Sequence, residues 1–227
     1  MNLTMLPLRI AATLTEGLFL PSLMLHLDGV LAAAWADIQG LPKPGMDGEL
    51  VKIEIPLQRE PEGRFHLASC FIPQFVVSET QFTNRRPVIE AAQRFGGPKL
   101  TRLDMATGVN KAYRVARSVG IPAAREVHAY CIGDKAHVEQ LLAHVTHLGK
   151  RRAVGLGQVR RWRVEVMQPD DLWDGFPVLS REGFALRPLP LDYPGLVVGR
   201  VEDMGLTYPY WDKKQWGMVA LPEVVYG

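Results

Sequence analysis

The sequence predicts an α+β protein built on a ferredoxin-like (RRM-like) βαββαβ unit, and three observations support this prediction. Apolar and polar residues alternate at 6–14 and again at 124–132, which indicates strands with one buried face. Between residues 134 and 149 the apolar residues recur at helical spacing. A glycine-rich loop and another alternating segment follow, so the order strand, helix, loop, strand supplies half of the unit.

The first half of the unit is expected from the opening strand, one helix and two more strands. Residues 22–38 are rich in leucine and alanine and start at Ser22, a suitable N-cap, so they predict a helix, which Gly29 weakens. Residues 50–57 and 64–76 predict two strands joined by a turn at the sequence REPEG.

The second half is defined more clearly. Asp134 is a suitable N-cap for the helix, and Gly149 is a suitable residue to end it. In the stretch VRRWRVEVM, residues 159–167, Trp162 and Val164 alternate with charged residues. This pattern predicts a strand whose tryptophan faces the core.

Length and composition indicate one globular domain with additions. The 227 residues are 47% hydrophobic and 22% charged, which is ordinary for a globular protein and excludes a disordered chain. We expect a single domain, 1–227, with a basic insertion at 78–120 and a β-rich C-terminal extension at 168–227. No apolar run approaches the roughly 18 residues of a membrane helix, and no secretory signal pattern is present. We therefore expect no membrane partner and a cytoplasmic location.

The charge pattern points to a polyanionic partner. The net charge is only +2, yet residues 149–164, GKRRAVGLGQVRRWRV, hold six cations and no acidic residue. Residues 81–117 form a second basic zone, with eight cations against two acids. Arginine dominates both zones, and its planar guanidinium suits phosphate binding and base stacking.

The glycines of 149–164 do not form a known nucleotide-binding motif. A P-loop needs GK[ST] between a strand and a helix, and that triplet is absent. A dinucleotide fingerprint needs a third glycine where GLGQVR has Arg160.

These residues resemble a known family. A helix followed by a glycine-rich loop with lysine and arginine, ending in GxG before a strand, resembles the C-terminal loop of the CRISPR-associated RAMP superfamily. The residues that match are Gly149, Lys150, Arg151, Arg152, Gly155 and Gly157. The stretches LHLDGVLAAAW, 25–35, and YPYW, 208–211, are similar to the small RAMP subunit of type IV CRISPR effector complexes.

The resemblance implies a RAMP domain that binds the 5′ handle of a CRISPR RNA (crRNA) and caps one end of the complex without catalysis. Partners are then the crRNA and other effector subunits, especially the backbone RAMP subunit, and target DNA is a further partner that it allows. The expected RNA-binding residues are Lys150, Arg151, Arg152, Gly155, Gly157, Arg160, Arg161 and Arg163. The insertion would be the thumb, in which charge alone selects Arg85, Arg86, Arg94, Lys99, Arg102, Lys111, Arg114 and Arg117.

Two other functions stay open at this point. Some RAMP relatives cut repeat RNA by metal-independent acid–base chemistry, and His26, beside Asp28, is the candidate catalytic residue for such an endoribonuclease. Alternatively, the basic zones of a protein–protein adaptor could meet an acidic partner. Steep loss of affinity with salt would favour RNA.

No metal site or cofactor is expected. The pair His144 and His147 has no acid or cysteine at ligand spacing. Cys70 and Cys131 lie in strand-like stretches outside any CxxC motif and are expected to be buried reduced thiols.

The tail aromatics are expected to close a core rather than to stack bases; they are Tyr208, Tyr210, Trp211 and Trp216.

Overall fold

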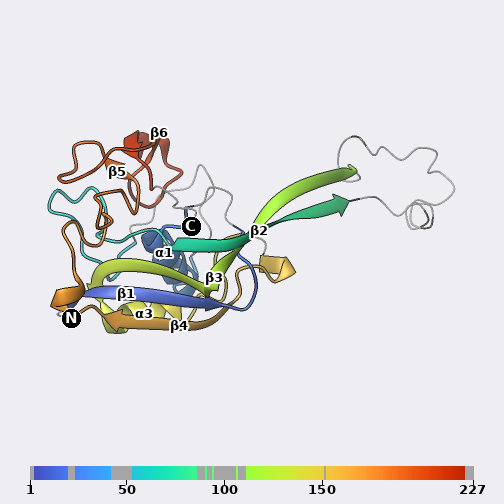
Figure 1. The fold of residues 1–227 in the computed structure, drawn as a ribbon. Coiled ribbons are helices and arrows are strands. Elements are labelled where there is room, and N and C mark those ends of the chain that lie inside the picture. Colours follow the sequence, from blue (N-terminus) through green and yellow to red (C-terminus); the bar gives the residue numbers. More distant parts are fainter. Residues whose placement is uncertain are drawn as a thin grey trace.

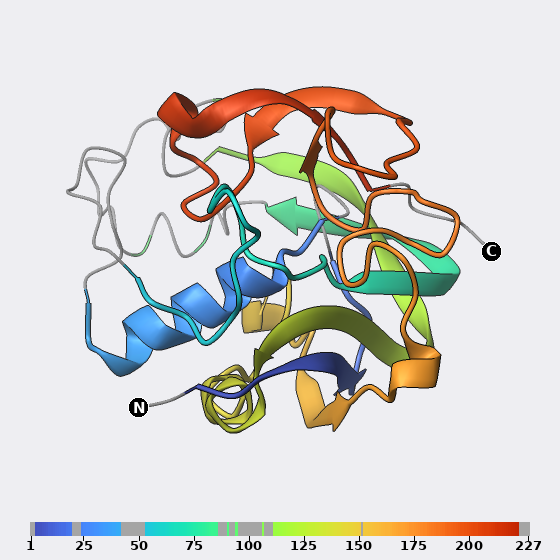
Figure 2. The same ribbon diagram turned by 90° about the vertical axis from the view of Figure 1, so that its left-hand side faces the viewer.

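A computed structural model describes residues 3–19, 24–41, 53–85, 90, 94, 106, 111–150 and 152–222. It confirms the α+β class, because two antiparallel sheets are combined with a few short helices. In Figures 1 and 2, helix α1 (Leu27–Ile38) lies between helix α3 (Lys135–Leu142) and the C-terminal extension. No helix among the described residues is long and apolar enough to cross a bilayer.

The larger sheet has four strands in the order β2-β3-β1-β4, and every neighbouring pair is antiparallel (Figure 1). Its strands are β1 (Met5–Leu14), β2 (Ile72–Arg85), β3 (Tyr113–Asp134) and β4 (Val159–Val166). The predicted strands at 6–14, 124–132 and 159–167 are therefore confirmed. Leu8 and Ile10 of β1 are fully buried and share one core with Leu31 of α1 and Leu142 of α3. Both helices thus pack on the same face of this sheet.

The predicted strand at 50–57 is wrong where the structure describes it, and so is the first part of 64–76. Residues 53–71 form only isolated bridges, such as Leu57 with Gly133 and Ala68 with Cys131. The pairing of β2 with β3 stops at His128. The C-terminal end of β3, beyond His128, is therefore left without β2, and the irregular segment 53–71 pairs with it through single bridges. Pro56 also lacks the N–H that a regular ladder needs.

The strands β2 and β3 continue into the predicted basic insertion. Their register runs from Ile72 opposite His128 to Arg85 opposite Tyr113. Residues 78–85 and 113–120 are therefore strand, and Figure 1 shows this ribbon projecting from the body.

Both predicted helices are shorter than expected. Helix α1 begins at Leu27, after His26, which makes no side-chain capping bond; Ser22 lies outside the described residues. Asp134 caps α3 as predicted, by accepting a hydrogen bond from the His137 N–H at 3.1 Å. The helix ends at Leu142 and not at Gly149, because the backbone of 146–148 pairs with residues 157–159, where β4 begins.

The C-terminal extension contains the second, smaller sheet. Its strands are β5 (Leu189–Pro190), β6 (Val201–Gly205) and β7 (Trp216–Ala220), in the order β5-β7-β6. Among the described residues, short 3-10 turns lie at Arg152–Val154, Pro169–Asp171 and Lys213–Gln215. Val178, Leu179 and Leu189 pack with Phe65 in a second core.

Candidate functional site

The glycine-rich loop joins α3 to β4 and carries exposed cations. Lys150 and Arg152 are both exposed, and the Lys150 N–H donates to the carbonyl of Phe19 at 3.1 Å. Arg151 lies outside the described residues. The loop is thus tied to the body by its backbone while the two described charges face solvent.

The two glycines of GLG have different surroundings. Gly155 has φ of +84°, and no described atom lies within 4 Å of the position of a Cβ there. Gly157 has φ of +70° and is buried, with its N–H donating to Gly17 and a Cβ position only 1.9 Å from the Leu148 carbonyl oxygen. Gly157 is therefore required by close packing of the chain's own backbone, and Gly155 is the one with open space for a phosphate.

The three arginines of β4 also differ. Arg160 and Arg161 are exposed. Arg163 is half-buried and donates two hydrogen bonds to Glu126, at 2.8 and 3.1 Å. Its charge is already neutralised. Trp162 is directed to the core, as predicted, with its indole N–H donating to the Val145 carbonyl.

Five of the eight predicted thumb residues are among the described residues. Arg85 lies in β2, and Arg114 and Arg117 lie in β3. Arg94 and Lys111 lie outside these strands and are exposed. Arg86, Lys99 and Arg102 lie outside the described residues. The basic insertion and the glycine-rich loop are therefore separate positive regions of one chain.

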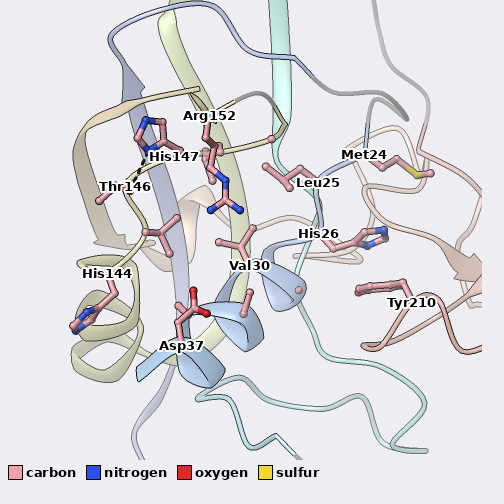
Figure 3. A pocket seen from close by; sticks show the side chains of 16 residues that line it. Met24, Leu25, His26, Val30, Asp37, His144, Thr146, His147, Arg152 and Tyr210 are labelled. Carbon is pink, nitrogen blue, oxygen red and sulfur yellow. Dashed lines mark hydrogen bonds between the residues drawn. The ribbon is translucent and has the colours of Figure 1, made fainter. Parts of the chain in front are cut away.

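A groove of about 440 Å³ lies beside the glycine-rich loop (Figure 3). One wall is α1, with Val30, Ala33 and Asp37, and the other is formed by 144–149 and Arg152. His26 and Tyr210 line it as well. The groove thus brings together three segments that are far apart in the sequence.

His26 is not a solvated residue at a helix edge. Its ring stacks on Tyr210 with centroids 3.8 Å apart and planes inclined by 23°, and its Nδ1 lies 3.6 Å from Cys70 Sγ. Burial lowers the pKa of His26 to about 4, so the ring is neutral near pH 7. Cys70 and Cys131 are buried free thiols, as predicted, and burial raises the pKa of Cys70 to about 12.

A buried charge network lies behind this stacked pair. Asp28 and Arg187 are each 1% exposed and lie 3.5 Å apart. The Tyr210 hydroxyl donates to Asp28 at 2.5 Å and accepts from Arg187 at 3.1 Å. Burial alone would raise the pKa of Asp28, but the charge of Arg187 and the hydrogen bond from Tyr210, together with the nearby histidines, outweigh it and hold this pKa well below its usual value.

The sequence interpretation missed Arg187 and its hydrogen bond to Tyr210. One signal was available, because Arg187 is the single charged residue in the apolar stretch FALRPLPL. The tail aromatics divide into two groups: Tyr210 is packed inside as predicted, whereas Trp211 and Trp216 are exposed at 40% and 38%. The core interpretation is wrong for those two tryptophans.

The described residues hold no cluster of three or more histidine, cysteine, aspartate or glutamate side chains that could bind a metal ion. His144 and His147 both line the groove. A basic residue, Arg152, and an acidic residue, Asp37, line the groove as well.

Comparison with known families identifies the class of protein. The chain matches a family model for a CRISPR-associated protein of type IV, over residues 6–222. That model is described as CRISPR type IV associated protein Csf3, and since it covers nearly the whole chain, the chain belongs to the Csf3 family. No curated protein matches the sequence. Family membership makes the chain a type IV CRISPR subunit and makes other subunits of that complex its partners.

Proposed function

We propose that this chain is a non-catalytic RNA-binding subunit that holds the 5′ handle of the crRNA and caps one end of a type IV CRISPR complex. The neighbouring backbone subunit and the guide RNA are its proposed contacts, and it acts in the cytoplasm. Its membership of the Csf3 family supports the assignment to such a complex.

The observation that carries the proposal is a set of unpaired cations. Lys150, Arg152, Arg160 and Arg161 are exposed, and none of the four forms an ion pair with a described carboxylate. On the same strand, by contrast, Arg163 is paired with Glu126. Phosphates would neutralise the four free charges, and Gly155 leaves open space for a sugar–phosphate backbone. The ribbon and the insertion supply a second positive region for the same RNA.

We also propose that the larger sheet and its helices form a ferredoxin-like RAMP unit. The chain order β1-α1-β2-β3-α3-β4 and the sheet order β2-β3-β1-β4, with both helices on one face, support it.

The environment of His26 supports a binding role over catalysis. With a pKa of about 4, this histidine is neutral near pH 7, so it holds no proton to donate as a general acid at that pH. Its Nδ1 faces Cys70 and its ring face is covered by Tyr210. The endoribonuclease remains the alternative that the experiment must separate.

The test uses the full-length chain, alone and co-purified with its type IV partner subunits. It is mixed in EDTA with a labelled repeat-derived RNA and with an RNA whose handle is scrambled. We expect tighter binding of the intact handle on a native gel and no cleavage on a denaturing gel. A discrete cut that the substitution His26→Ala abolishes would establish the endoribonuclease. Equal binding of both RNAs would contradict handle recognition.

Charge variants then locate the binding surface. K150A/R152A should shallow the slope of log K against log salt by about 1.4, because each lost phosphate contact with a single strand removes roughly 0.7. The matched control K135A/R181A removes one lysine and one arginine elsewhere and should leave the slope unchanged. An unchanged slope in K150A/R152A would show that Lys150 and Arg152 do not contact RNA phosphates.

A further inference from the structure

The groove between α1 and the segment 144–152 has the size and the lining of a ligand site. Its volume of about 440 Å³ is within the range of roughly 300–1,000 Å³ that is typical of small-molecule pockets. One long wall is apolar, with Leu25, Val30 and Ala33. Such a wall suits a flat, apolar group.

The end of the groove is shaped by the stacked pair of His26 and Tyr210. The Tyr210 ring packs directly on α1, since a Cβ at Gly29 would lie 3.4 Å from its Cε2. Tyr210 is held in turn by its hydrogen bonds with Asp28 and Arg187. The pair is thus fixed before any ligand arrives, which lowers the entropic cost of binding.

Polar groups in the groove are arranged asymmetrically. Figure 3 shows the Arg152 guanidinium directed into the groove, above Val30 and Asp37 in that view. His144 and His147 line the same side, and His147 Nδ1 lies 3.0 Å from the Thr146 hydroxyl. An anionic group is favoured at Arg152 and disfavoured at Asp37, so a ligand with one charged end has a preferred orientation.

We propose that this groove holds one unstacked nucleotide of the guide RNA, with its base against the α1 wall and its phosphate at Arg152. The inference rests on the proposed function and adds a defined site to it. Lys150 and Gly155 lie on the same loop as Arg152, so a backbone that follows the loop delivers the adjoining nucleotide to the groove. Asp37 and the histidines supply acceptors and donors for the base edges or the ribose hydroxyl.

A single substitution can fill the groove without disturbing the core. Ala33 is exposed on α1 and lines the groove, so Ala33→Trp inserts an indole into it. Ala136 is exposed on α3 and does not line the groove, so Ala136→Trp is the matched control. Melting curves of both variants establish that they are folded.

The readout is photocrosslinking in the purified type IV complex, with 5-iodouridine placed at successive positions of the guide. In the wild-type protein we expect one position to crosslink to peptides from 24–37, 144–152 or the Tyr210 segment. Ala33→Trp should lower the yield at that position at least about fivefold, the lower end for loss of one base contact, and Ala136→Trp should not.

The outcomes separate this inference from the proposed function. If the handle is still bound through Lys150 and Arg152 but crosslinks avoid these peptides, the groove is not a nucleotide site and the proposed function stands. If no guide position crosslinks to this chain and K150A/R152A changes nothing, both fail. If Ala33→Trp releases a protein subunit and leaves the RNA crosslinks intact, a protein side chain occupies the groove and the inference is wrong. Should Ala33→Trp not fold, the wild-type crosslink map alone decides.

Discussion

The hydroxyl of Tyr210 donates a hydrogen bond of 2.5 Å to the carboxylate of Asp28, and it joins the C-terminal extension to helix α1. Both groups are part of one buried network with Arg187. The network holds the Tyr210 ring on His26, at the end of the groove. The geometry of the groove therefore depends on residues from both ends of the chain.

Tyr210→Phe should destabilise the protein by roughly 1–3 kcal/mol. The variant keeps the ring on His26 but removes one hydrogen bond to the buried Asp28 carboxylate, whose remaining partners are Arg187 and the Gly29 N–H. Urea denaturation measures the free energy of unfolding. Tyr208→Phe is the control, because Tyr208 makes no hydrogen bond through its hydroxyl to a described residue, and it should change stability little. Equal stability of both variants would show that the 2.5 Å contact contributes nothing.

Arg187→Met should cost about 3–5 kcal/mol, since it leaves Asp28 charged and buried without its counter-ion. The variant also removes donors to the carbonyls of His66 and Ala68. The exposed pair of Arg200 and Glu202 is the comparison, and Arg200→Ala should cost less than about 1 kcal/mol. Similar losses in both variants would contradict the buried network.

Stability should fall on acidification between about pH 6.5 and pH 4 because of His26. Its pKa is 6.5 unfolded and about 4 folded, so the unfolded chain binds the proton more readily. The contribution is complete above pH 6.5 and is lost as the pH falls toward 4, by up to roughly 3 kcal/mol. Urea titrations at several pH values should give a shallower dependence for His26→Gln than for the wild type. His144→Gln, at an exposed position, is the control, and an identical pH profile in His26→Gln would refute the burial argument.

Gly157→Ala should be far more harmful to folding than Gly155→Ala. A Cβ at Gly157 would meet the Leu148 carbonyl oxygen at 1.9 Å, so the loop backbone must move. At Gly155 the space is open and the cost is only the left-handed conformation, about 1–2 kcal/mol. Thermal melts of the two variants compare them directly, and equal melting temperatures would contradict the close packing at Gly157.

The sequence by itself determined the elements that have a strong local pattern. Alternation at β1 and β4, the Asp134 cap of α3 and the separation of two basic zones were all readable from neighbouring residues. The type IV assignment was also within reach, since the loop and the YPYW tail carried the family resemblance that the Csf3 match confirms. These features depend on interactions within about a dozen residues, and local pattern reports them well.

Only the tertiary structure decided which distant residues meet. Residues 53–57 and 64–71 have the composition of strands, but the free end of β3 that this segment pairs with is defined by where β2 stops. Whether a cation is free or neutralised is likewise decided by a distant partner, as Arg163 and Glu126 show. The groove follows the same rule, because the stacking of His26 on Tyr210 accompanies the buried pair of Asp28 and Arg187. Charge pairing and burial act across space, and a local pattern does not record which distant side chain will supply them.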